Sequence, residues 1–392
     1  MKKIKETGLK SWLSDNKWSV IILAAAAVIF IIMCCMCRTP SADVTAEGDY
    51  AEYETGKVVQ IISDNTWQDE ASDGAYRGEQ SMIVEVTSGQ YEGEQLLVDN
   101  AVGPLYGVPA EVGDSVVLTI STYTDGTVLA TVHEFNREAA LVIVVLLFML
   151  ATVLVGGKTG AKSLVGLVIT VACIFCILIP LLLKGMPTLL TVFITCAYVA
   201  VVSFVILGGV KKKTVCAICG TVAGIAIALL FGLFAQCITR VNGLRVSDVE
   251  PLLQLRQTGT PIGLRGLLVG GITISALGAV MDVAMSLASS MSEIKDVDNS
   301  IERKALFKSG MNIGRDMVGT MTNTLILAFI GSSFVLIIYL YSLGLQPHML
   351  FSSAYLAIEV ISGVASSIGV ILSVPITALI SSIILTKTKK VC

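Results

Sequence analysis

The chain has 392 residues, of which 54% are hydrophobic and only 15% are charged, and its mean hydropathy is +0.80. This composition excludes an ordinary soluble globular protein and indicates an integral membrane protein, whose first partner is the lipid bilayer. Apolar runs long enough to cross a bilayer need about 20 residues each. They predict eight spans, which begin near Ser19, Ala139, Leu164, Thr188, Thr214, Gly266, Val318 and Tyr355.

The first apolar run, Val20 to Cys37, follows a charged N-terminal stretch. It is longer than the apolar core of a typical signal peptide, and no small-residue cleavage site follows it immediately. We therefore expect residues 1–38 to be a cytoplasmic N-terminus and an uncleaved transmembrane anchor, with a cleaved signal peptide as the less favoured alternative.

Residues 39–137 are polar and strongly acidic. Between Thr39 and Asn136 the chain carries 18 Asp and Glu residues against only Lys57 and Arg77. This balance argues against nucleic acid as a partner, and the segment is too polar to cross a membrane. It predicts an extracytoplasmic domain between the first and second spans.

Five short runs in this segment alternate in the manner of half-buried strands, at 57–62, 81–89, 94–100, 114–122 and 127–135. Turn-forming Gly, Asn and Asp residues separate these runs, and Asp-Gly in YTDGTV at 123–128 is typical of a hairpin turn. We expect a small, partly closed β-barrel of OB-like type. Such barrels often bind oligomers, but this one lacks a basic groove, so a passive lid or assembly role is favoured over binding.

Residues 138–392 are predicted to form a multi-helix membrane domain. Short loops rich in Lys and Arg stay in the cytoplasm, and placing both termini there puts 18 of the 27 Lys and Arg residues inside. The four arginines between 240 and 265 are discordant with this orientation. The sequence thus predicts a polytopic α-helical membrane protein with both termini cytoplasmic.

One face of the sixth span carries only small or polar residues. Positions three and four apart share a helix face, and this rule selects Gly271, Ser275, Gly278, Asp282, Ser286, Ser289 and Glu293. The opposite face is apolar and suits lipid or a packed neighbour. We expect Asp282 to face the interior of the bundle.

The seventh span repeats this pattern with Ser309, Asn312, Asp316, Gly319 and Asn323, beside Thr320 and Thr324. Helices with small residues approach each other closely, so the two stripes predict a hydrophilic seam between spans six and seven. Glu359, which shares a face with Ser362 and Ser366, is a third contributor. Pro375 is expected to kink the last segment or to divide it into a re-entrant hairpin.

Three interpretations of Asp282 remain open. An ionisable residue in a span costs at least about 2.5 to 3.5 kcal/mol at the bilayer centre and less near an end. Asp282 is either paired with Arg315 or capped by serines, or part of a proton or cation pathway, or part of a site for a polar solute.

The ten cysteines predict no disulfide framework, because none lies in the acidic segment. C-x-x-C occurs in CCMC, CIFC and CAIC, which leaves a redox or metal relay open. Small, soft apolar residues are the favoured interpretation, because no acid or histidine accompanies the pairs. We expect no metal site and no cofactor.

Three long motifs resemble the YibE/F-like family of bacterial multi-pass membrane proteins. They are LGAVMDVAMSLASSMSEI, SGMNIGRDMVGTMTNTLILAFIGSS and SIGVILSVPITALIS, and HEFNREAALVIVVLLFML and GGKTGAKSLVGL precede them in order. The resemblance runs from the β domain to the C-terminus. It implies a permease in a bacterial plasma membrane and carries over no catalytic residue.

The sequence favours a secondary transporter for an unknown small solute or ion over a non-catalytic envelope scaffold or sensor. An enzyme is disfavoured, because there is no H-E-x-x-H or G-x-S-x-G motif. A homo-oligomer is left open. The candidate transport residues are Asp282, Ser275, Gly278, Ser286, Ser289, Asn312, Asp316, Asn323, Thr324 and Glu359.

Overall fold

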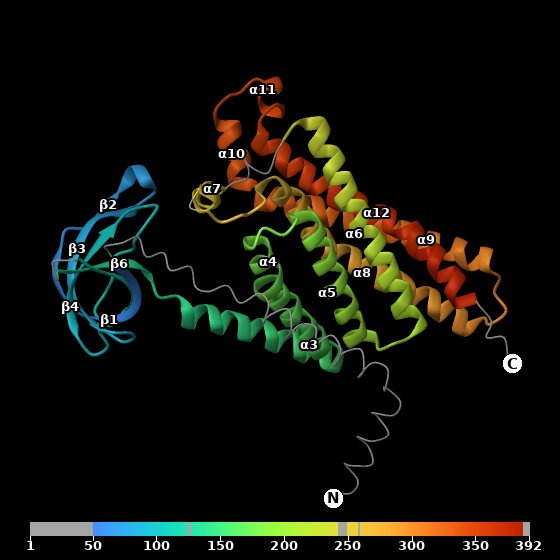
Figure 1. Cartoon of the computed structure of the whole chain (residues 1–392), viewed down its shortest axis with the longest axis horizontal. Coiled ribbons are helices and arrows are strands. Elements are labelled where there is room, and N and C mark those ends of the chain that lie inside the picture. The colour runs from blue at the N-terminus through green and yellow to red at the C-terminus, as the bar shows by residue number, and fades with distance from the viewer. Residues whose placement is uncertain (1–49, 124–126, 242–248, 258, 387–392) are drawn as a thin grey trace, which may run out of the picture. The chain divides into compact units, whose positions relative to one another are not determined.

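The computed structural model describes residues 50–123, 127–241, 249–257 and 259–386 (Figure 1). The predicted anchor at Val20 to Cys37 and the centre of the predicted turn at 123–128 lie outside these residues. The chain divides into two compact units, with the boundary between Ala151 and Thr152.

The first unit contains a five-stranded β-barrel, as predicted, but the barrel is closed where a partly closed one was expected. Strand β1 pairs with both β3 and β5, which closes the sheet, and β4 and β6 form a parallel pair. All five predicted strands are present, and the short β2, which pairs with β3, was not predicted. The strands are β1 (Tyr50–Asp64), β2 (Trp67–Asp69), β3 (Ala75–Val86), β4 (Gln95–Val102), β5 (Ser115–Thr122) and β6 (Val128–Phe135).

Alternate residues of these strands fill the barrel, since successive side chains of a strand point to opposite faces. Met82, Val98 and Leu118 are fully buried there. Two buried amides hold the connection between β4 and β5 against the barrel. Asn100 Nδ2 donates to Val108 O at 3.0 Å, and the amide N–H of Ala110 donates to Gln80 Oε1 at 2.9 Å.

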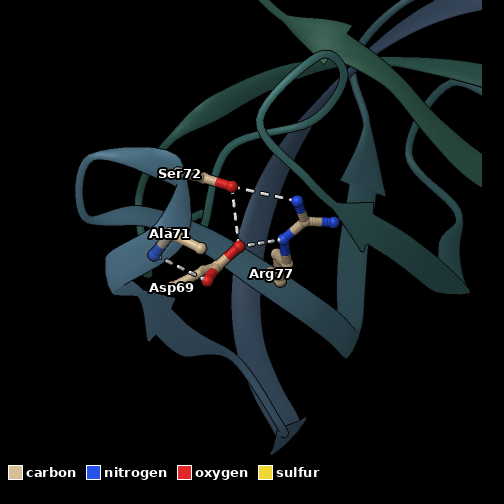
Figure 2. Close-up of polar contacts among 4 residues, drawn as sticks. All are labelled: Asp69, Ala71, Ser72 and Arg77. Carbon is tan, nitrogen blue, oxygen red and sulfur yellow. Dashed lines mark hydrogen bonds and ion pairs between the residues drawn. The ribbon is translucent and has the colours of Figure 1, made fainter.

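A polar cluster closes the turn between β2 and β3 (Figure 2). Asp69 begins the 3₁₀ turn η1 (Glu70–Ser72), and its carboxylate accepts from Ser72 Oγ at 2.6 Å and from the amide N–H of Ala71 at 3.1 Å. Arg77 Nε donates to the same carboxylate. The bond from Ser72, followed by that from Arg77, lowers the pKa of Asp69 below its ordinary value.

Apolar helices make up the second unit and the end of the first. Five helical segments of the described chain are long and apolar enough to cross a membrane, and α9 with α10, bent by 61°, adds a sixth if the pair is one span. The predicted total of eight stays a prediction. The helices are α3 (Glu138–Cys173), η2 (Ile174–Leu178), α4 (Ile179–Leu183), α5 (Thr188–Gly208), α6 (Lys212–Thr239), α7 (Val249–Gln257), η4 (Leu264–Gly266), α8 (Leu267–Val297), α9 (Arg303–Ser332), α10 (Phe334–Ser342), α11 (Pro347–Phe351) and α12 (Ala354–Thr386).

The two spans predicted near Ala139 and Leu164 lie in one segment of 46 residues, Glu138–Leu183. Its continuity is interrupted at Gly157, whose φ of 54° and ψ of −135° are not helical. Glycine takes this positive φ without the steric cost that a Cβ atom brings. At the other end of the chain, α12 is one continuous helix with Pro375 inside it, so of the two alternatives for this segment the structure has the single span and not the re-entrant hairpin.

Helix α12 packs closely against α6 and α8 because glycines line the contact. A Cβ atom added at Gly224 of α6 would lie 2.5 Å from Val280 Cγ1 of α8, and one added at Gly369 of α12 would lie 2.7 Å from Ala228 Cβ of α6. Only glycine permits backbones to approach this far. The apolar face of α8, including Val283, is buried in this core.

Candidate functional site

The polar stripe of α8 lies on the exposed side of the helix, which corrects the prediction that Asp282 faces the interior. Asp282, Gly278 and Ser286 are exposed, and Ser289 is half-buried. The residues that face the core of the second unit are apolar, among them Val280 and Leu287. The prediction failed because α6 and α12 present glycines to α8, and an apolar face fills that space better than a polar one.

The polar stripe of α9 is exposed too. Asn312, Asp316, Asn323 and Thr324 all lie on the surface of the unit, while Gly310 and Gly314 face the core. A Cβ atom at Gly310 would lie 2.6 Å from Met291 Sδ, and one at Gly314 would contact Val374.

The predicted seam between spans six and seven is therefore not formed as expected. Cβ atoms added at Gly271, Gly278 and Gly319 would meet nothing within 4 Å, so these glycines do not bring α8 and α9 together. The close contacts of both helices run instead through the glycines of α6, α9 and α12 described above.

Asp282 is not paired with Arg315, although that pairing was one of its three interpretations. Among the described residues, the ion pairs belong to the barrel unit, and Arg315 Nη1 instead donates to Asn312 Oδ1 at 3.3 Å. Thr324 Oγ1 is also satisfied locally, by the carbonyl of Thr320 at 3.0 Å.

Two predicted residues do meet, in a cavity of about 310 Å³ between α7, α8 and α12. Glu359 and Ser275 line it together with Ser362, and we call it the serine cavity. Ser275 Oγ lies 3.1 Å from Ser366 Oγ, which ties α8 to α12 at this point. Glu359 is a half-buried residue, because α12 lies against α8 and α9.

A second cavity, of about 190 Å³, adjoins the first. Glu359 and Phe329 line both cavities. Among the described residues that line the second cavity, Ser333, at the bend between α9 and α10, is the only one with a polar side chain besides Glu359. We call it the apolar cavity, because its remaining side chains are aliphatic or aromatic.

Gly363 positions Phe329 beside Glu359. The ring lies against the backbone of α12, where a Cβ atom at Gly363 would be 3.4 Å from Phe329 Cδ2. Neither Phe329 nor Ser333 was predicted as a site residue. No signal in the sequence singled them out, because their positions depend on the packing of α9 against α12, which is distant in the sequence.

A buried group of hydroxyls at the contact between α6 and α12 was also not predicted. Thr221, Thr377 and Ser381 are fully buried. Small hydroxyl residues in a membrane-spanning helix favour close packing, so we assign this group to helix packing. The cysteines of CIFC and CAIC differ in their surroundings, since Cys173 and Cys216 are buried and Cys176 and Cys219 are exposed.

The described residues define a protein with a closed β-barrel and a bundle of apolar helices of membrane-spanning length. A family model described as YibE/F-like protein matches residues 144–387, more than half of the chain. The protein belongs to the YibE/F-like family, which confirms the resemblance; the match covers the helices and begins after the barrel. Comparison with curated proteins and with solved structures finds no match.

Proposed function

We propose that this protein is a secondary permease and that the serine cavity is part of its solute path. The observation that carries the proposal is the Glu359 carboxyl group, half-buried in the apolar helix α12 and beside Ser275 and Ser362. Intramembrane carboxyl groups are costly and commonly mark solute or ion paths. The sequence has no Walker A motif, so an ion or solute gradient is the proposed driving force, with no enzymatic step and no cofactor.

The proposed setting is the plasma membrane of a bacterial cell, with eight spans, both termini in the cytoplasm and the barrel outside. The distribution of Lys and Arg supports this orientation. The barrel is proposed to be OB-like, which the closed order β1-β3-β4-β6-β5 with its parallel β4–β6 pair supports.

Charge movement in reconstituted vesicles tests the proposal. Vesicles that contain the protein should give solute-induced currents for at least one member of a panel of inorganic cations, anions, amines and amino acids. Glu359→Gln, which keeps the size of the side chain and removes its charge, should lower that current at least tenfold. The matched control Glu302→Gln changes an exposed residue that precedes α9 and should leave it unchanged.

A non-catalytic assembly role in the cell envelope is the second candidate, and one observation favours it. Polar side chains exposed on membrane-spanning helices are costly against lipid, and Asp282 of α8 and Asn323 of α9 are both exposed. A neighbouring protein, or a second copy of this chain, would cover them. Parent vesicles that show no current above protein-free vesicles across the whole panel would contradict the permease and favour this role.

A further inference from the structure

The serine cavity and the apolar cavity are both lined mainly by apolar side chains, and Glu359 lies at both of them. Hydroxyls of Ser275 and Ser362 line the first cavity. Aliphatic side chains such as Ile330 and Val360 line the second. Glu359 belongs to both, so a ligand whose charged group binds at this carboxyl group can place an apolar body against the aliphatic lining beside it.

Glu359 has no cationic partner among the described residues. Neither an ion pair nor a hydrogen bond joins it to any residue in the described ranges. A half-buried carboxylate without a protein cation favours a cationic ligand, because the attraction between opposite charges is stronger where water is partly excluded.

We propose that these two cavities bind a cationic amine with an apolar body, a proposal that rests on the permease function and names its substrate class. The ammonium group lies at Glu359 and against the ring of Phe329, since aromatic rings attract quaternary ammonium groups. The apolar body lies between Ile330 and Val360. A divalent metal ion fits less well, because the described residues contain no group of three acidic, His or Cys side chains.

Binding of benzyltrimethylammonium to the full chain tests the proposal. The protein is placed in phosphatidylglycerol nanodiscs, whose lipid has no amine, and binding is measured against empty discs. Neopentylbenzene, the isostere with carbon in place of nitrogen, should compete at least tenfold more weakly than unlabelled probe. Glu359→Gln should weaken probe binding at least tenfold, and Glu302→Gln should leave it unchanged.

A second variant separates the two cavities. Val360→Thr keeps the side-chain volume and makes the apolar cavity more polar, so it should weaken benzyltrimethylammonium and leave tetramethylammonium binding unchanged. Thermal melting of each variant in discs reports whether it folds. Discs with added phosphatidylethanolamine test whether the natural ligand is a lipid. Weaker probe binding in these discs indicates that the amine headgroup of the lipid competes for the site, and unchanged binding indicates that the ligand is a free amine.

Equal binding by folded Glu359→Gln, or equal competition by the neutral isostere, would overturn this inference. The proposed permease function can be contradicted independently of the proposed amine site. Specific amine binding without any current in vesicles would support the amine site and contradict the permease function. Currents for another solute, together with no amine binding, would support the permease function and contradict the proposed substrate class.

Discussion

Two carboxyl groups in the membrane-spanning helices, Asp282 and Glu359, have similar sequence surroundings and different structural ones. Both follow aliphatic residues and are four residues away from a small or hydroxyl residue. Asp282 lies on the exposed side of α8, whereas Glu359 lines two cavities. The difference comes from the neighbouring helices, because residues at the start of α7 and near the end of α9 line the cavities beside Glu359, whereas the side of α8 that carries Asp282 is exposed.

At the residue scale, the Asp69 cluster predicts a pH dependence of barrel stability. The pKa of Asp69 is lowered in the fold by Ser72 and then by Arg77, so its contribution is present at neutral pH and is lost as the pH falls below about 4, the ordinary range of Asp. Thermal melting of the fragment 39–137, which contains every pairing of the barrel, should show this loss.

The comparison of two variants isolates that contribution. Asp69→Asn should lower the melting temperature at pH 7 and should bring the pH 7 and pH 3 values closer together. Asp73→Asn removes the same charge from the same turn and keeps the bonds to Ser72 and Arg77, so it should behave like the parent fragment. Parallel pH profiles for parent and Asp69→Asn would contradict the assignment.

At the scale of the elements, glycine positions decide which helix faces meet. Leucine at Gly224 of α6 must displace Val280 and Ser373, which lie 2.5 Å and 2.8 Å from a Cβ atom there. Overpacking of this kind costs about 1–3 kcal/mol or more. Gly224→Leu should therefore lower the melting temperature in detergent and the amount of protein in the membrane.

The matched substitution is Gly278→Leu on the exposed side of α8. A Cβ atom there meets nothing within 4 Å, so this variant should accumulate and melt like the parent. If Gly278→Leu is the damaging variant and Gly224→Leu is harmless, the packing described for α6, α8 and α12 is wrong.

The elements were largely predictable and their buried faces were not. Strand alternation is local, so runs such as 114–122 gave β5 almost to the residue, whereas the three-residue β2 was too short to show a period. The apolar length of α8 was equally clear. The face of α8 that is buried could not be predicted, because lipid and a packed core are both apolar. The glycines that determine this face, such as Gly369, are also distant from α8 in the sequence.

The cavity illustrates the same limit. Glu359 and Ser275 were both predicted as site residues, yet their common neighbour Phe329 was not, because it reaches the cavity through the packing of α9 against α12, which the sequence pattern does not show.

At the scale of the whole molecule, the predicted orientation places the barrel outside the cell and the connection between α5 and α6 inside. In a background without the native cysteines, Gln90→Cys and Lys212→Cys expose one thiol in each place, since both positions are exposed in the structure. In intact cells, Gln90→Cys should react with an impermeant maleimide and Lys212→Cys only after the membrane is opened. The reverse pattern would contradict the orientation.

The closed barrel also has a mechanical consequence. Strands β1 and β6 both pair antiparallel with β5, so they run in the same direction, and the chain enters at Tyr50, the start of β1, and leaves at Phe135, the end of β6. A pull that separates these two ends acts along the strands and loads the hydrogen bonds of both ladders at the same time. Sheets loaded in shear resist far more force than sheets peeled open one bond at a time. The pairing of the strands therefore makes the barrel more resistant to a pull on its two ends than to a pull that peels away one strand.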